Sequence, residues 1–431
     1  MTRHPQIPRR GAAQARRVTT TSRQLEALAA KFRAAIAAQH FEQAGSLAEV
    51  ALKLAPGHPS VMADYALCLM RTKRYDAAYA IYQRIHAMPA TQQRQAGDTW
   101  LDGFAEVCGW LGLRDELREL GHQSLAAADE RFRGHLRWPI DRPPPAFDAR
   151  AAERNVIAYS LYGANPRYCE PAVMNARIVD ELFPGWTCRV YLDDTVPLHV
   201  IERLRQAGAQ VVQVDERTRR EIPATMWRFL VMDDPSVVRY LVRDADALLS
   251  EREVPTVAQW LESGRWFHHM RDYFTHTELL LAGMWGGCNG VFPALYPLMR
   301  DFAASHQRSA RFTDQHFLRE VLWATVRESI LNHDELFGFH GAQPFPAHPP
   351  IRWRTSEFHV GSNVSFRRIG GQGMFPDGEV QTIVLDEDGE PSREYQARIQ
   401  NEHWSMDFPF YLIDALGAGT LRVSLASDAG K

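Results

Sequence analysis

The chain has 431 residues, of which 45% are hydrophobic, and a formal net charge of −3. This length allows two or three domains with cores of their own, and the composition is that of a globular protein with no overall signature of polyanion binding. No run approaches 18 consecutive apolar residues, so we expect no transmembrane segment.

The five cysteines are scattered along the chain without a Cys-x-x-Cys pair: Cys68, Cys108, Cys169, Cys188 and Cys288. Scattered single cysteines argue against a zinc ribbon or a disulfide framework and are typical of a reducing compartment. We therefore predict a cytoplasmic protein and leave peripheral association with a membrane open.

Residues 1–22 contain several arginines, and the first acidic residue is Glu26. No apolar segment follows, which excludes a secretory signal and predicts a flexible basic arm. Contact of this arm with anionic lipid or nucleic acid is an alternative, as is a transit peptide. Our main prediction includes no nucleic-acid partner.

A repeat follows in residues 23–135. An aromatic residue followed by alanine three positions later occurs at Phe41 and Ala44 and again at Tyr75 and Ala78. The spacing of about 34 residues resembles the tetratricopeptide repeat (TPR), in which two antiparallel helices form each unit. A degenerate third unit begins near Trp100. Such an array either binds a protein partner on its concave face or braces the neighbouring domain.

Residues 136–150 include three consecutive prolines and predict a stiff linker. Beyond it, apolar runs at 155–161, 188–192 and 210–214 alternate with helical patterns at 171–182 and 199–207. This alternation predicts an α/β domain over residues 151–370 with a parallel sheet covered by helices. No Gly-x-Gly-x-x-Gly follows the first strand, which weighs against a usual dinucleotide site.

The segment from Arg239 to Ser250 reads RYLVRDADALLS. Its apolar part predicts a fourth strand, which places Asp244 and Asp246 at the carboxyl edge of the sheet, where ligands bind in such folds. Alternate residues of an extended segment point the same way, so both carboxylates can face one cation. Oxygen ligands at this spacing suit Mg²⁺ or Mn²⁺. The alternative is a charged turn.

The second half of the chain resembles a family, the metal-dependent glycosyltransferases of the GT-A fold. The resemblance covers about residues 154–366. It rests on Asp-x-Asp and on an arginine-bearing segment upstream of it, Met226-Trp227-Arg228-Phe229-Leu230. Three later segments follow in the order that the family uses: His269-Met270-Arg271-Asp272, Ala282-Gly283-Met284-Trp285-Gly286 and Thr313-Asp314-Gln315-His316-Phe317-Leu318. It is similar to retaining enzymes related to glycogenin and lipooligosaccharide galactosyltransferases, and more so to a group of bacterial proteins. The resemblance implies a GT-A-like mixed sheet flanked by helices.

This resemblance also implies roles for individual residues. A nucleotide-diphosphate sugar, a UDP- or GDP-sugar, would be the donor, with Mn²⁺ or Mg²⁺ between its phosphates and Asp244 and Asp246. Arg228 would contact the donor, with Arg243 next to the metal motif, and Gly283 would allow close approach of the backbone to the sugar. Sugar binding and catalysis would fall to Asp272, Asp314 and Gln315, and base binding to Tyr159, Ser160 and Tyr162. A third metal ligand would come from His333 or His359.

Several of these residues also have structural interpretations. Arg228 could pair with Asp233 or Asp234 on a helix surface, the tyrosines could be core residues, and Asp314 could be a helix N-cap. A late histidine could be structural. The Lys-Pro-Trp sequence that follows the late histidine in the relatives is missing near His359.

The overall prediction is a glycosyltransferase that transfers sugar to a glycan, a lipid-linked glycan or a protein. One alternative is a TPR adaptor with an inactive GT-A domain. Another is a phosphatase of the haloacid dehalogenase type, whose Asp-x-Asp supplies a nucleophile. Residues 371–431 form a C-terminal extension with no assigned role, in which residues 381–385 predict a strand.

Overall fold

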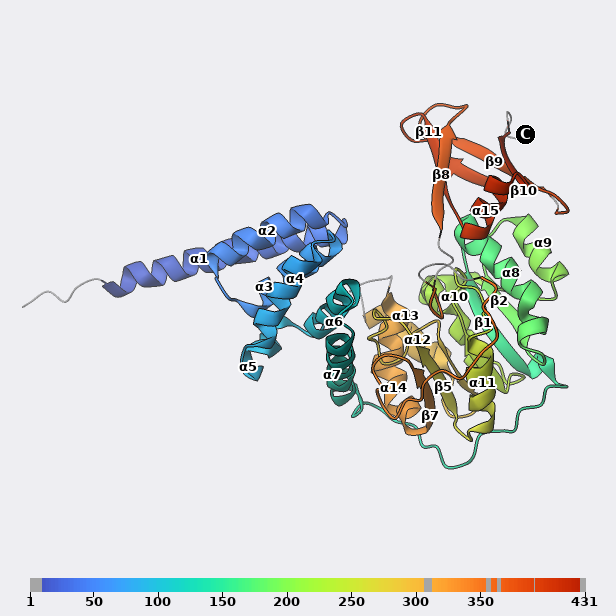
Figure 1. Cartoon of the computed structure of the whole chain (residues 1–431), viewed down its shortest axis with the longest axis horizontal. Helices are drawn as coiled ribbons and strands as arrows, with labels where there is room; N and C mark the ends of the chain where they lie inside the picture. Colours follow the sequence, from blue (N-terminus) through green and yellow to red (C-terminus); the bar gives the residue numbers. More distant parts are fainter. Residues whose placement is uncertain (1–9, 306–311, 354–357, 363–365, 391, 427–431) are drawn as a thin grey trace, which may run out of the picture. The chain divides into compact units, whose positions relative to one another are not determined.

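A computed structural model describes residues 10–305, 312–353, 358–362, 366–390 and 392–426 (Figure 1). The chain divides into two compact units, residues 1–127 and 128–431. The first unit is helical, and the second contains every strand in the described part of the chain. The predicted fold class is confirmed: an all-α array of helical hairpins precedes an α/β domain with a mixed sheet.

The first unit consists of paired helices joined by short turns. They are α1 (Arg10–Ala37), α2 (Phe41–Leu54), α3 (Pro59–Arg71), α4 (Tyr75–His86), α5 (Ala90–Gln93), α6 (Trp100–Leu111) and α7 (Arg114–Phe132), the last of which crosses into the second unit. Ala44 and Ala78 are fully buried, so consecutive helices approach closely at these positions. Tyr82 of α4 stacks on Phe104 of α6, with ring centroids 5.7 Å apart.

One helix begins earlier than the sequence predicted, and the predicted linker contacts the rest of the second unit. Helix α1 begins at Arg10, inside the segment predicted to be a flexible arm, because alanine, arginine and glutamine are strong helix formers. Residues 1–9 lie outside the described residues. The predicted proline-rich linker packs along the second unit: the Trp138 amide donates to Thr325 Oγ1 (3.0 Å), and Trp266 Nε1 donates to the Arg142 carbonyl (2.8 Å).

A seven-stranded sheet forms the centre of the second unit, in the order β3-β2-β1-β4-β6-β5-β7. Its strands are β1 (Asn155–Leu161), β2 (Thr187–Leu192), β3 (Gln210–Gln213), β4 (Arg239–Val242), β5 (Phe267–Arg271), β6 (Trp285–Cys288) and β7 (Ile330–Asp334). Strand β6 is antiparallel to both of its neighbours, and the other pairs are parallel. The predicted parallel strands are therefore present, and β6 makes the sheet mixed.

Helices cover this sheet, and its central strands β1 and β4 are buried along their whole length. All seven residues of β1 are buried, which is typical of a parallel strand between two helical layers. The helical segments are α8 (Pro166–Leu182), α9 (Leu198–Gln206), α10 (Glu216–Glu221), the 3₁₀ segment η3 (Ala224–Asp233), α11 (Glu253–Glu262), α12 (Leu295–Ser305), α13 (Thr313–Phe317), a π-helical turn (Leu318–Leu322) and α14 (Trp323–Val326). The predicted arginine-bearing helix is thus the 3₁₀ segment η3.

The C-terminal region forms two small antiparallel sheets (Figure 1). They contain β8 (Arg367–Gln372) with β11 (His403–Phe408), and β9 (Val380–Glu387) with β10 (Arg393–Arg398) and β12 (Leu421–Leu425); α15 (Phe410–Ala418) precedes β12. Glu170 of α8 accepts hydrogen bonds from Arg203, Arg393 and Tyr395. This buried ion cluster ties β10 to helices α8 and α9.

Candidate functional site

The candidate site lies where β1 and β4 end. These strands are neighbours, yet the chain continues from β1 to β2 and β3 on one side, while β4 lies on the other side. Such a switch in strand order opens a crevice at the carboxyl ends of the strands. A cavity of about 290 Å³ lies there, lined by Ser160, Leu161, Tyr162, Tyr168, Thr225, Arg228, Asp244, Ala245, Asp246 and Asp314. We call it the Asp-x-Asp cavity.

The two aspartates of the cavity follow β4 directly. Asp244 accepts a hydrogen bond from Arg228 Nη1, and Asp246 Oδ2 accepts one from Arg167 Nη2 at 3.1 Å. In the described part of the chain, these side-chain hydrogen bonds use only one oxygen of each carboxylate. Two hard oxygen donors on alternate residues therefore fit a Mg²⁺ or Mn²⁺ ion.

Burial raises the pKa of two carboxyl groups in the lining of the cavity, Asp246 and Asp314. Burial, and then the neighbouring charge of Asp244, raises the pKa of Asp246 to about 6, although Arg167 acts in the opposite direction. Burial also raises the pKa of Asp314 against the effect of Arg228. Like-charged groups that are held together out of water are a recurrent feature of functional sites.

Arg228 connects the acidic groups of the cavity. Its backbone amide donates to Ser160 Oγ (2.9 Å), and its guanidinium donates to the Arg243 carbonyl (3.0 Å), to Asp244 and to Asp314 Oδ2 (3.0 Å). The side chain is buried. Its side-chain partners Ser160, Asp244 and Asp314 all line the cavity, and the predicted alternative of a surface pair with Asp233 or Asp234 is not present.

Gly283 and Gln315 shape the wall beside Asp244. A Cβ atom at Gly283 would overlap the Asp244 carboxylate, so the absence of a side chain makes room for this carboxylate. The amide of Gln315 accepts from Ala282 N (3.0 Å) and donates to the Leu280 carbonyl. Gln315 does not line the cavity. It holds the loop that places Gly283.

Two aromatic side chains line the cavity at the end of β1. Tyr162 is 45% exposed and contacts Trp227 edge to face, and Tyr168 lies in the first turn of α8. Tyr159 is buried and does not line the cavity, which agrees with its alternative interpretation as a core residue. Asp314 lies inside α13, whose N-cap is Phe312, so Asp314 is not the cap.

Arg243 and His333 are engaged elsewhere. Arg243 Nε donates to Glu253 Oε2 (2.7 Å), and this buried arginine does not line the cavity. Both ring nitrogens of His333 have partners, because Nδ1 lies 3.0 Å from His268 Nε2 and Nε2 lies 2.8 Å from the side-chain oxygen of Gln259. These contacts give Arg243 and His333 structural explanations, and we leave both out of the proposed site.

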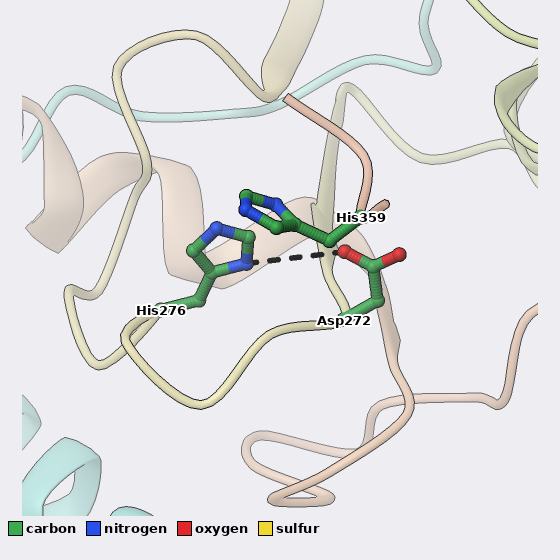
Figure 2. Close-up of side chains that lie close together, drawn as sticks. All are labelled: Asp272, His276 and His359. Atoms are coloured by element: carbon green, nitrogen blue, oxygen red, sulfur yellow. Dashed lines mark ion pairs between the residues drawn. The ribbon is translucent and has the colours of Figure 1, made fainter. Parts of the chain in front are cut away.

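Asp272 and His359 come together in a second group, with His276 as its third member. One potential ligand atom from each residue lies within 4.8 Å of the others (Figure 2). Burial raises the pKa of Asp272 to about 7, whereas the Val360 amide and Arg252 act to lower it. We call these three residues the Asp272 cluster. None of them lines the Asp-x-Asp cavity.

Three residues of these places were not predicted from the sequence: Arg167, Tyr168 and His276. Arg167 and Tyr168 belong to the loop and first helical turn after β1, where the amide of Arg167 donates to the side chain of the N-cap Asn165. Their position after the first strand was a usable signal, because ligands bind at this edge. His276 carries no such signal, since its closeness to His359 arises only in the folded chain.

Comparison with known proteins gives one family match. A tetratricopeptide-repeat model matches residues 35–96, in agreement with the predicted helical repeats. No curated protein matches the chain at a significant level. In the described part of the chain, no helix is both long and apolar enough to span a membrane.

Solved structures of two proteins show distant likeness. A mutant of the Thermobaculum terrenum O-GlcNAc transferase is 14% identical, with a TM-score of 0.25 over 52% of this chain and 51% of that chain. Thus this chain spans about half the length of that protein. Glucosyl-3-phosphoglycerate synthase of Mycobacterium tuberculosis is 14% identical (TM-score 0.27, 48% of this chain and 79% of that chain). A second structure of this synthase, in complex with Mn²⁺, UDP and phosphoglyceric acid, has a chain that is 12% identical, with a TM-score of 0.26 over 68% of this chain and 95% of that chain. TM-scores this low do not establish a shared fold.

Proposed function

We propose that the second unit is a metal-dependent glycosyltransferase that uses a nucleotide-diphosphate sugar. One observation carries this proposal: three carboxylates, two arginines that contact them and two tyrosines meet at the switch point of the sheet. A nucleotide sugar needs these same elements, namely a cation and arginines for its phosphates and an aromatic surface for its base. The order of motifs that resembles GT-A enzymes supports the same conclusion.

The carboxylates of Asp244 and Asp246 would hold Mn²⁺ or Mg²⁺. When bound, the cation neutralises negative charge on the diphosphate, which grows as the bond to the sugar breaks. Arg228 and Arg167 already contact these carboxylates. Their guanidinium groups can turn part of their hydrogen bonding toward phosphate oxygens, for which arginine has a matching geometry.

In this proposal Asp314 binds the donor sugar. Its buried carboxylate is held by Arg228 on the wall of the cavity, and it can accept hydrogen bonds from sugar hydroxyls. Such contacts also stabilise positive charge that develops at the anomeric carbon. Tyr162 and Tyr168 would contact the base. Gln315 and Gly283 act indirectly, by positioning the loop beside Asp244.

The proposed metal site uses only two protein ligands. In the described part of the chain, no third histidine, cysteine or acidic side chain groups with Asp244 and Asp246. Mg²⁺ and Mn²⁺ commonly complete their coordination with waters and phosphate oxygens, so a third side chain is not required. This differs from the expectation that His333 or His359 is the third ligand.

For the first unit we propose recruitment of a protein partner or a protein acceptor. The TPR match supports this, because paired helices of this type expose a concave surface for polypeptide binding. We also propose a cytoplasmic location, on the basis of five buried cysteines without a disulfide.

A binding experiment tests the proposed function. The full chain is freed of metal by chelation, and its melting temperature is measured with a panel of UDP- and GDP-sugars, with and without Mn²⁺. A ligand that binds the folded state stabilises it in proportion to ligand excess, so we expect at least one donor to raise the melting temperature only with Mn²⁺. Stabilisation without turnover would favour an inactive adaptor. Phosphate release from phosphomonoesters would favour the phosphatase.

A further inference from the structure

The Asp272 cluster combines two imidazoles with one carboxylate, and of its residues His276 is buried while Asp272 and His359 are partly buried. Asp272 follows β5, His276 belongs to the loop after it, and His359 comes from a distant segment of the chain (Figure 2). The side chain of Asp272 is 4% exposed, and His276 is 7% exposed. Two imidazoles and a carboxylate are a common ligand set for transition metals.

His276 has a ring nitrogen that lacks a hydrogen-bond partner among the described residues, which is the observation that most favours a bound ion. Its Nδ1 is buried and has no hydrogen-bond partner in the described part of the chain. The Oδ1 atom of Asp272 lies 3.9 Å from this nitrogen, too far for a hydrogen bond (Figure 2). A buried polar atom without a partner is costly, and a shared cation would satisfy both groups.

The orientation of His359 agrees with metal binding. Its Nδ1 lies 3.0 Å from the Val360 carbonyl, which can only accept a hydrogen bond, so Nδ1 carries the proton and Nε2 carries the lone pair. Metal-binding histidines typically donate their other N–H to a backbone carbonyl in this way. Stacking on Tyr273, with ring centroids 4.1 Å apart, further fixes the ring.

Asp272 is positioned by groups outside the cluster. The Val360 amide lies 3.1 Å from each carboxylate oxygen, and Arg252 Nε lies 3.1 Å from Oδ2. Arg252 Nη2 in turn lies 3.6 Å from Glu335 Oε1, so the negative charge of Glu335 offsets the positive charge of Arg252. The oxygen that faces His276 is Oδ1. These contacts fix the carboxylate and leave Oδ1 directed toward the imidazole.

We propose that Asp272, His276 and His359 form a second metal site, selective for a first-row transition ion such as Zn²⁺ over Mg²⁺. Imidazole nitrogens favour Zn²⁺, whereas the oxygen-only pair in the Asp-x-Asp cavity favours Mg²⁺ or Mn²⁺. Two histidines and one carboxylate leave a coordination position for water. The ion would also link the His359 segment to the end of β5. This proposal does not depend on the transferase reaction.

Zn²⁺ titration of the metal-free full chain tests the site. The background is the double variant Asp244→Asn/Asp246→Asn, which removes the carboxylates of the other site. By calorimetry we expect one tight Zn²⁺ equivalent in this background. Adding His276→Ala should lower the Zn²⁺ affinity by about a hundredfold or more. Loss of a group that only hydrogen-bonds to a metal ligand already lowers metal affinity by up to about a hundredfold, and His276 is proposed as a ligand itself. Adding His403→Gln, at an exposed histidine on β11, should change nothing.

A second variant and a second signal keep the test decisive. His359→Gln changes a less buried ligand, so it serves if His276→Ala fails to fold, and we expect the same loss of Zn²⁺. Co²⁺ in place of Zn²⁺ should give strong visible absorption in the background and weak absorption in either variant. No tight Zn²⁺ in the background, or equal affinity in His276→Ala, His359→Gln and the background, would overturn the proposal.

Discussion

The Asp-x-Asp cavity and the Asp272 cluster both contain aspartate carboxylates, but different chemical groups surround these carboxylates. The lining of the cavity includes three carboxylates, from Asp244, Asp246 and Asp314, and two tyrosines, and two arginines contact the carboxylates. The cluster has one carboxylate, two imidazoles and little exposure. The first suits an ion that arrives with an anionic ligand, and the second suits an ion that the protein holds by itself. Donor chemistry, rather than charge alone, distinguishes the two places.

Burial is the first cause of a raised aspartate pKa in both places, but the other causes differ. At Asp246 the neighbouring Asp244 adds to the effect of burial. At Asp272 the main opposing group is the Val360 amide, with Arg252 next. A pair of like charges is relieved by a shared cation, whereas a fixed carboxylate beside two imidazoles provides a preformed ligand set.

The largest expected effect comes from removing both charges of the cavity. We expect Asp244→Asn/Asp246→Asn to reduce sugar-nucleotide turnover by about a thousandfold, because the cation that stabilises the leaving diphosphate is lost. Zn²⁺ affinity at the Asp272 cluster should stay unchanged. Turnover with Mn²⁺ and Zn²⁺ calorimetry check the two halves of this prediction. Loss of both functions together would mean that the two places are one site.

Asp314→Asn should have the next largest effect. Loss of a contact to the sugar should lower turnover by roughly a hundredfold, while Mn²⁺ and nucleotide binding stay nearly constant. Steady-state kinetics and nucleotide calorimetry separate these steps. A companion variant, Gln315→Ala, should weaken both binding and turnover through the loop at Gly283. Full activity of Asp314→Asn would assign this residue to structure.

Gly283→Ala should reduce Mn²⁺ affinity at the cavity by about tenfold, comparable to the loss of a group that orients a metal ligand. The new Cβ would overlap the Asp244 carboxylate and displace it. Gly417→Ala is the matched control, because its Cβ meets no atom within 4 Å and its position in helix α15 favours alanine. Mn²⁺ titration should separate the two variants, and equal affinities would contradict the assigned role of Gly283.

The smallest expected effect is on metal-free stability. The pKa of Asp246 is raised from 3.8 to about 6 in the folded state, so its contribution to stability is complete below 3.8 and is lost as pH rises through 6. Asp246→Asn should therefore stabilise the metal-free protein at pH 7 by about 1 to 3 kcal/mol. Chemical denaturation at pH 4 and pH 7 measures this, and no difference between variant and parent at pH 7 would argue against a strained carboxylate.

The sequence predicted the fold class well, for physical reasons. Apolar runs such as 155–161 can only be buried strands in a sheet covered on both faces, and Asp-x-Asp after such a run must lie at its edge. Ser160, Tyr162, Arg228 and Asp314 also line the cavity. The antiparallel β6 was not predicted, because its short Gly-rich run carries little periodicity.

Features that depend on distant contacts escaped prediction. Glu170, Arg203 and Arg393 form a buried cluster from three elements, and nothing in their local sequence marks them as partners. Burial acts to raise the pKa of Glu170, but its arginine and tyrosine partners lower it to about 2. The same limit applies to His276 and His359, whose pairing depends on where the segment near residue 359 meets the end of β5.

The central claim is that Asp244 and Asp246 bind a sugar nucleotide through a divalent cation. Calorimetric titration of the metal-free chain with the donor identified by thermal shift, with and without Mn²⁺, tests it most directly. We predict that the donor binds the wild-type chain only when Mn²⁺ is present and that it does not bind Asp244→Asn/Asp246→Asn under either condition. Equal, metal-independent binding of the donor to both proteins would contradict the claim.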